Sequence, residues 1–155
     1  MLLRPVEPED IAVFFAHQSD PESCLLADFP ARERAAHEAH WARVLRDPTA
    51  IARAIVIDDR VIGNVGSYVD EDRREVGYWL GREYWGRGHA TAALALFLTE
   101  VRERPLFAHV AAHNRGSRRV LVKCGFVPIA SPGDGDADEV LLRLGGEALW
   151  PPTTD

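Results

Sequence analysis

The stretch from Leu80 to Thr91 combines residue types in a spacing that fits phosphate chemistry, and it reads LGREYWGRGHAT. A helix-forming segment follows from about residue 88 to 102. The first turn of a helix has amide groups without an intrahelical partner and lies at the positive end of the helix dipole. Glycine lets a ligand approach such a backbone closely. The stretch therefore predicts an anion-binding loop suited to a pyrophosphate, with added charge from Arg87 and Arg82.

Other phosphate-binding loops match this stretch less well. A nucleoside-triphosphate loop requires Gly-Lys-Ser/Thr, which the stretch lacks. A dinucleotide site requires Gly-x-Gly-x-x-Gly and an acidic residue at the end of the next strand, whereas the strand predicted over Leu106–Ala111 holds no acid. A plain turn in which the glycines serve packing remains an alternative, as does a nucleotide-binding domain.

Apolar periodicity and turn residues predict the elements that must position this loop. Four helices are expected, at residues 9–18, 31–46, 88–102 and 114–124. Seven strands are expected, at residues 1–6, 51–57, 61–69, 75–80, 106–111, 126–129 and 139–144. Residues 19–30, which contain Pro21 and Pro30, and residues 131–138 are expected to be loops.

The order of these elements favours a mixed α/β fold. The consecutive strands between residues 51 and 80 suggest antiparallel pairing, and the strand–helix–strand stretch from 75 to 111 suggests a parallel crossover. We therefore expect a twisted mixed sheet of about seven strands flanked by about four helices. It occupies one domain over residues 1–146, followed by a C-terminal tail over 147–155. Gly63 and Gly66 in a central strand predict a bulge or a close approach of two backbones.

Composition argues against several other classes of protein. The net charge of -6 disfavours nucleic-acid binding, which requires a basic surface. No apolar run is long enough to cross a membrane, and the start of the chain lacks the pattern of a signal peptide. Cys24 and Cys124 lack the spacing of metal ligands, so no metal site is expected. We therefore expect a cytoplasmic protein with neither a nucleic-acid nor a membrane partner.

Three segments of the chain resemble the GCN5-related N-acetyltransferase (GNAT) superfamily: residues 75–80 (EVGYWL), 84–91 (YWGRGHAT) and 114–126 (NRGSRRVLVKCGF). The resemblance is closest to the ribosomal-protein N-terminal acetyltransferases and extends over about residues 1–144. It implies a GNAT-like fold and an N-acetyltransferase that moves an acetyl group from acetyl-CoA to a primary amine. The acceptor stays open between a protein N-terminus, a side chain and a small amine. A monomer or a homodimer is expected.

The resemblance also implies which residues contact CoA. The end of the strand before the loop would pair with the pantetheine arm, and the loop amides would bind the pyrophosphate. The later helix would add contacts from its first turn and its last. The CoA-binding residues predicted in this way are Tyr78, Trp79, Leu80, Trp85, Gly86, Arg87, Gly88, His89, Ala90, Thr91, Asn114, Ser117 and Lys123.

One departure from the family concerns the acid that protonates the leaving thiolate. Many members carry a tyrosine four residues after the position of Ser117, where this sequence has Leu121. Ser117 stands at the position of the substitute acid proposed for the subgroup that the chain resembles, so the resemblance implies Ser117 as the acid. The departure keeps open a second function, a catalytically silent acyl-CoA-binding or sensing module. Asn114 and Ser117 also fit ordinary residues at the start of a helix.

Two residues are candidates for the general base, and with Ser117 they make up the predicted catalytic set. Glu75 is the first choice, because it begins the strand that leads to the cofactor and a carboxylate can accept the amine proton. The alternative is a solvated hairpin carboxylate beside Arg73 and Arg74. His113 is the second choice, because histidine titrates near neutral pH, and the alternative is a loop histidine.

Overall fold

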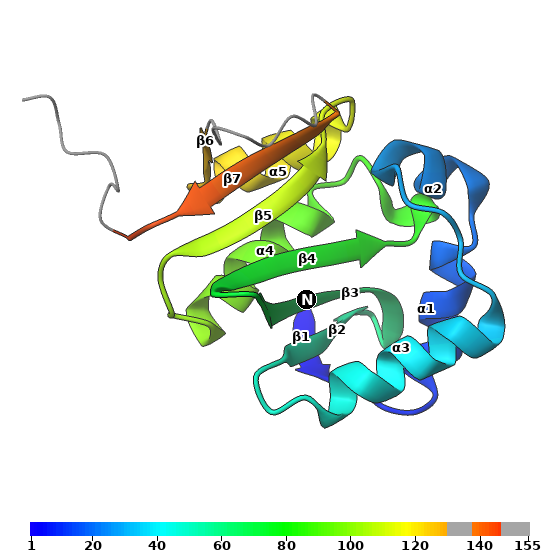
Figure 1. Ribbon diagram of the computed structural model, residues 1–155. Coiled ribbons are helices and arrows are strands. Elements are labelled where there is room, and N and C mark those ends of the chain that lie inside the picture. The colour runs from blue at the N-terminus through cyan, green and yellow to red at the C-terminus, as the bar shows by residue number, and fades with distance from the viewer. Residues whose placement is uncertain (130–137, 147–155) are drawn as a thin grey trace, which may run out of the picture.

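Seven strands form one mixed sheet in the computed structural model, which describes residues 1–129 and 138–146 (Figure 1). The strand order is β1-β2-β3-β4-β5-β7-β6, and only β4 and β5 run parallel. This arrangement confirms the predicted mixed sheet, the antiparallel centre and the parallel crossover. The strands are β1 (Leu2–Pro5), β2 (Ile51–Ile57), β3 (Arg60–Asp70), β4 (Arg73–Leu80), β5 (Leu106–Ala111), β6 (Val127–Ile129) and β7 (Glu139–Leu144).

Helices cover both faces of this sheet (Figure 1). On one face, α4 and α5 pack over a core that includes Leu94, Phe97 and Leu121. On the other face, α1 and α3 pack over a smaller core that joins Phe14 and Trp41 to β2. The helices of the described chain are α1 (Asp10–Gln18), α2 (Pro21–Ala27), α3 (Arg34–Arg46), α4 (His89–Glu100), α5 (Arg115–Lys123) and the short 3-10 helix η1 (Arg82–Tyr84).

The prediction of a loop over residues 19–30 is wrong, because α2 lies there and raises the number of α-helices to five among the described residues. The carboxylate of Asp20 accepts hydrogen bonds from the amide and the hydroxyl of Ser23, at 3.0 and 2.9 Å. Pro21 occupies the first turn, where its missing N–H costs nothing. Of the predicted loop at 131–138, residues 131–137 lie outside the described residues, as does the tail at 147–155.

A close approach of two strands occurs at Gly63, as the sequence predicts. The register between β2 and β3 shifts next to this residue, which marks a β-bulge. A Cβ atom at Gly63 would overlap the carbonyl oxygen of Trp79 on β4. The absence of a side chain therefore lets β3 hold the end of β4 in place.

Strands β4 and β5 pair at a single position before they separate. The Cα partners are Glu75 and Phe107. From Val76 to Leu80, β4 pairs with β3 alone. One edge of β4 thus has no strand partner at its C-terminal end, which lies beside the start of α4.

Candidate functional site

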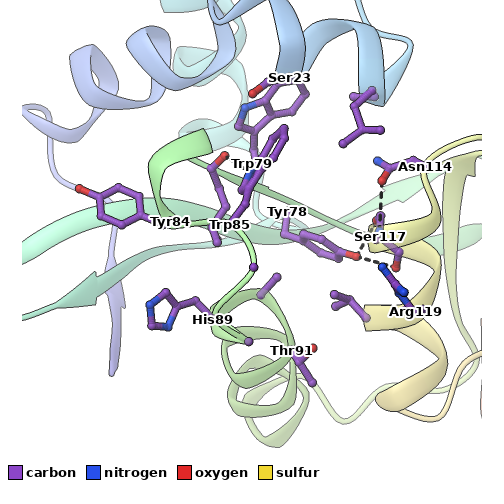
Figure 2. A pocket seen from close by; sticks show the side chains of 18 of the residues that line it. Ser23, Tyr78, Trp79, Tyr84, Trp85, His89, Thr91, Asn114, Ser117 and Arg119 are labelled. Carbon is purple, nitrogen blue, oxygen red and sulfur yellow. Dashed lines mark hydrogen bonds between the residues drawn. The ribbon is translucent and has the colours of Figure 1, made fainter.

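A cavity of about 490 Å³ lies at the C-terminal end of β4, bordered by α2, the start of α4 and α5 (Figure 2). All the predicted CoA-binding residues line it except Arg87, whose side chain is exposed. Arg82 is engaged elsewhere, because it pairs with Asp20 at 3.2 Å and with Glu22 at 3.1 Å. The predicted residues that line the cavity are Tyr78, Trp79, Leu80, Trp85, Gly86, Gly88, His89, Ala90, Thr91, Asn114, Ser117 and Lys123.

The loop before α4 has the backbone of an anion-binding site. Gly86 and Gly88 adopt φ values of 77° and 79°, in the left-handed region that favours glycine. No atom lies within 4 Å of the Cβ position at either residue, so open space adjoins both. Gly88 is the residue that precedes α4, and no side chain caps the helix. The amides of the first turn therefore remain available to a ligand.

A pair of hydroxyl groups joins the two sides of the cavity. The Tyr78 hydroxyl lies 2.7 Å from Oγ of Ser117 and donates to the Ser117 carbonyl oxygen at 3.1 Å (Figure 2). Burial raises the pKa of Tyr78 to about 12, so the phenol stays protonated at neutral pH. Oδ1 of Asn114 accepts the Ser117 amide at 3.1 Å, which confirms Asn114 as the residue that caps α5.

Glu75 is buried on β4 and does not line the cavity. Only 4% of its surface is exposed. Its Oε1 atom lies 2.6 Å from Nδ1 of His109 on β5, close enough for an ion pair although the two groups are not aligned as a hydrogen bond. The alternative of a solvated hairpin carboxylate is therefore wrong. Arg74 pairs instead with Glu103, and Arg73 stacks on Phe107.

His113 lies outside the cavity. Its side chain is exposed, and Nε2 lies 2.9 Å from the carbonyl oxygen of Leu25 in α2. Leu121, where many GNAT members carry a tyrosine, is 2% exposed and belongs to the core. The structure thus brings Ser117 into the cavity but leaves the two predicted bases outside it, one buried beside His109 and one on the surface.

Several residues that line the cavity are not predicted from the sequence. Ser23, Leu26 and Ala27 line the cavity from α2, the helix that was not predicted. The sequence does mark His109 as a candidate, since it is the one polar residue within the apolar strand 106–111. The other lining residues that were not predicted are Tyr84, Gly116, Arg119 and Val120.

Metal clusters and membrane-spanning helices are both absent from the described residues. Within residues 1–129 and 138–146, no group of three or more His, Cys, Asp or Glu side chains is placed to hold a metal ion. No helix in that part of the chain combines the length and the apolar character that crossing a membrane requires. Both cysteines are free thiols.

Comparison with known proteins places the chain among acetyltransferases. A family model described as "Acetyltransferase (GNAT) domain" matches residues 1–127. The chain is 27% identical over 139 residues to "Uncharacterized N-acetyltransferase p20" of Bacillus licheniformis, which covers 81% of this chain and 78% of that protein. It is 29% identical over 102 residues to "Putative ribosomal N-acetyltransferase YdaF" of Bacillus subtilis strain 168, which covers 61% of this chain and 56% of that protein.

A solved structure has the same fold. It is "RimL- Ribosomal L7/L12 alpha-N-protein acetyltransferase in complex with Coenzyme A", with a TM-score of 0.73. The superposition covers 91% of each chain at 17% sequence identity. At this identity the likeness concerns the fold, and it agrees with the mixed sheet and helices described above.

Proposed function

Since the chain belongs to the GNAT acetyltransferase family and is an acyl-CoA-dependent acetyltransferase, we propose that it acetylates a primary amine with acetyl-CoA as the donor. One observation carries the proposal. The left-handed glycines before α4, with open space around them, adjoin the edge of β4 that has no strand partner. A nucleotide pyrophosphate and an extended arm attached to it fit this arrangement.

The loop supports binding of the pyrophosphate through its backbone. Gly86 and Gly88 leave free the space that side chains would fill, and the start of α4 offers amides that no side chain caps. Amides at a helix N-terminus favour a negatively charged ligand. Lys123, at the end of α5, lines the same cavity and adds a positive charge. The residues present therefore fit the phosphate portion of CoA.

The edge of β4 supports binding of the pantetheine arm. Past Glu75, the side of β4 that faces β5 has no ladder partner, and Tyr78, Trp79 and Leu80 line the cavity. Backbone groups of a strand edge can pair with an extended ligand as they would with another strand. Acetyl-CoA, once bound, supplies an activated acyl group in the form of a thioester. We propose that β4 holds this group near Tyr78.

Glu75 and His109 are the groups we propose for removal of the amine proton. Glu75 lies on β4 where the strand parts from β5, and His109 extends from β5 beside it. A carboxylate next to an imidazole stabilises the protonated form that the ring takes when it accepts a proton. The side chain of His109 is 31% exposed, so solvent or an acceptor can reach it. His113, bound to α2 at the surface, is the weaker candidate.

Tyr78 and Ser117 are the groups we propose for protonation of the thiolate. Their hydroxyl groups lie 2.7 Å apart in the cavity, and the raised pKa of Tyr78 keeps its proton available. One of the two hydroxyl groups can donate its proton to the leaving sulfur and regain one from the other hydroxyl, which solvent then reprotonates. The pair thus supplies the acid that Leu121 does not.

Thiol release from acetyl-CoA, measured with a panel of peptides and small amines, tests the proposed function. We expect turnover with at least one amine, and Glu75→Gln is expected to lower kcat/KM by about 100-fold with CoA affinity unchanged. Glu103→Gln is the matched control, because it neutralises an exposed carboxylate paired with Arg74. If CoA stabilised the protein against heating but no amine gave turnover, the result would favour the alternative function, a module that binds acyl-CoA without catalysing transfer.

Removing the Tyr78 hydroxyl tests the proposed acid. Tyr78→Phe is expected to lower kcat by about 10-fold, because Ser117 loses the partner that orients it and the thiolate loses a donor. The free energy of unfolding should fall by only about 1 kcal/mol, the usual value of one hydrogen bond. Ionisation of Tyr78, with its pKa of about 12, should not limit wild-type activity below about pH 10. A variant with full kcat would exclude the pair as the acid.

A further inference from the structure

A second cavity, of about 200 Å³, lies on the face of the sheet opposite α4 and α5, between α1 and α3. We call it the α1–α3 pocket. Figure 1 shows α1 and α3 beside each other next to β3 and β4. Tyr78 and Trp79 line both this pocket and the larger cavity. A molecule in the α1–α3 pocket would therefore lie next to the part of β4 where we place the thioester.

Aromatic rings and hydrogen-bond donors make up much of the wall of this pocket. Phe14, Phe29 and Trp41 are among the lining residues, and the ring centroids of Phe14 and Trp41 lie 4.9 Å apart. Gln18 and His37 also line the pocket, with 7% and 2% of their surfaces exposed. Among the described residues, neither Nε2 of Gln18 nor Nδ1 of His37 has a hydrogen-bond partner. Buried polar groups without partners are costly, and a ligand would satisfy them.

The charge of the pocket is positive. Arg32 lines it with its guanidinium 4.8 Å from the centre of the Phe29 ring, and no described carboxylate lies within ion-pair distance of it. No Asp or Glu is among the described lining residues. Burial and the nearby Arg32 lower the pKa of His40 to about 4 and lower that of His37, so both imidazoles are neutral at pH 7. Among the described lining residues, Arg32 is thus the charged side chain that a ligand in the pocket would contact.

We propose that the α1–α3 pocket binds the acceptor by a carboxylate, so that the substrate is an amine that carries a carboxylate group. This inference rests on the proposed function and names its substrate class. A guanidinium binds a carboxylate through two parallel hydrogen bonds, and the Gln18 amide adds a third donor. A polyamine would instead place a second positive charge near Arg32, where repulsion opposes binding and no described lining residue is a carboxylate that could pair with that charge. The pocket is smaller than the usual ligand site of about 300–1,000 Å³, which suits a small molecule or one terminal residue of a peptide.

Matched pairs of amines test this preference. Free amino acids are compared with their amides, which differ only in the carboxylate, and peptides with an acidic first residue are compared with their uncharged counterparts. Polyamines complete the panel. In at least one of these two kinds of pair, we expect kcat/KM to be at least about 10-fold higher for the amine that carries the carboxylate. A preference in the first kind indicates a free amino acid as the acceptor, and a preference in the second kind indicates a peptide N-terminus. Faster turnover of the amides or polyamines would overturn the inference while the proposed function stood. No turnover of any amine would overturn the proposed function itself.

Substitution of Arg32 tests the same inference from the side of the protein. Arg32→Gln is expected to raise KM for the carboxylate acceptor by about 10- to 100-fold, with little change in kcat or CoA affinity. Arg32→Lys should restore part of the loss, because it keeps the charge. Arg34→Gln is the control, since Arg34 also stacks on a phenylalanine, Phe15 at 4.6 Å, but does not line the pocket. Equal effects of Arg32→Gln and Arg34→Gln, or none of either, would contradict the proposed role.

Discussion

Gly88→Val is expected to lower CoA affinity by about 100-fold or more and to lower kcat/KM with it. Valine at a φ of 79° is strained, which costs about 1–3 kcal/mol. Its side chain would also fill the open space beside the loop, where we place the pyrophosphate. Loss of two charge-assisted hydrogen bonds, at about 1.5–3 kcal/mol each, accounts for the expected change. Titration calorimetry with CoA, at a temperature where the variant is folded, gives the affinity.

The control for this variant is Ala95→Val, which adds a β-branched side chain at an exposed position of the same helix. Its cost should stay below about 1 kcal/mol, since it reflects helix propensity alone, and CoA affinity should not change. Wild-type affinity in the folded Gly88→Val protein would show that the pyrophosphate binds elsewhere. The assignment of the loop would then fail even though the family membership remained.

Gly63→Ala is expected to lower the free energy of unfolding by about 3 kcal/mol or more. The new Cβ would overlap the carbonyl oxygen of Trp79 and approach Cα of Leu80 to 3.0 Å. Both are backbone atoms of a neighbouring strand, so they cannot turn away as a side chain would. The shift of β4 should also weaken CoA binding, because Trp79 and Leu80 line the cavity. Urea denaturation followed by tryptophan fluorescence measures the change in stability.

Gly77→Ala provides the comparison on the facing strand. No heavy atom lies within 4 Å of the Cβ position at Gly77, and its φ lies outside the left-handed region. Alanine there should change the free energy of unfolding by no more than about 1 kcal/mol in either direction, because the reduced freedom of the unfolded chain offsets small losses in the folded state. Similar losses for Gly63→Ala and Gly77→Ala would mean that glycine in these strands matters through propensity and not through the close approach.

The local features of this protein were determined by the sequence alone. The strand, loop and helix around residues 80–102 follow from patterns within a few residues of one another, as does the capping role of Asn114. The close approach at Gly63 was also readable, because a glycine inside a strand has few other uses. The wrong prediction at α2 has a local cause too: proline is typical of loops, but it is also favoured in the first turn of a helix, where Pro21 lies.

Only the tertiary structure decided which side chains meet. Tyr78 and Ser117 are 39 residues apart in the chain, and their contact depends on how α5 packs against β4. The approach of Glu75 to His109 depends on the parallel register of β4 and β5, which no local pattern specifies. The α1–α3 pocket likewise arises where helices and strands distant in sequence pack together. Short-range periodicity sets each element, whereas the contacts between elements depend on the packing of the whole chain. The glycine loop before α4 was therefore predictable from the sequence, and the α1–α3 pocket was not.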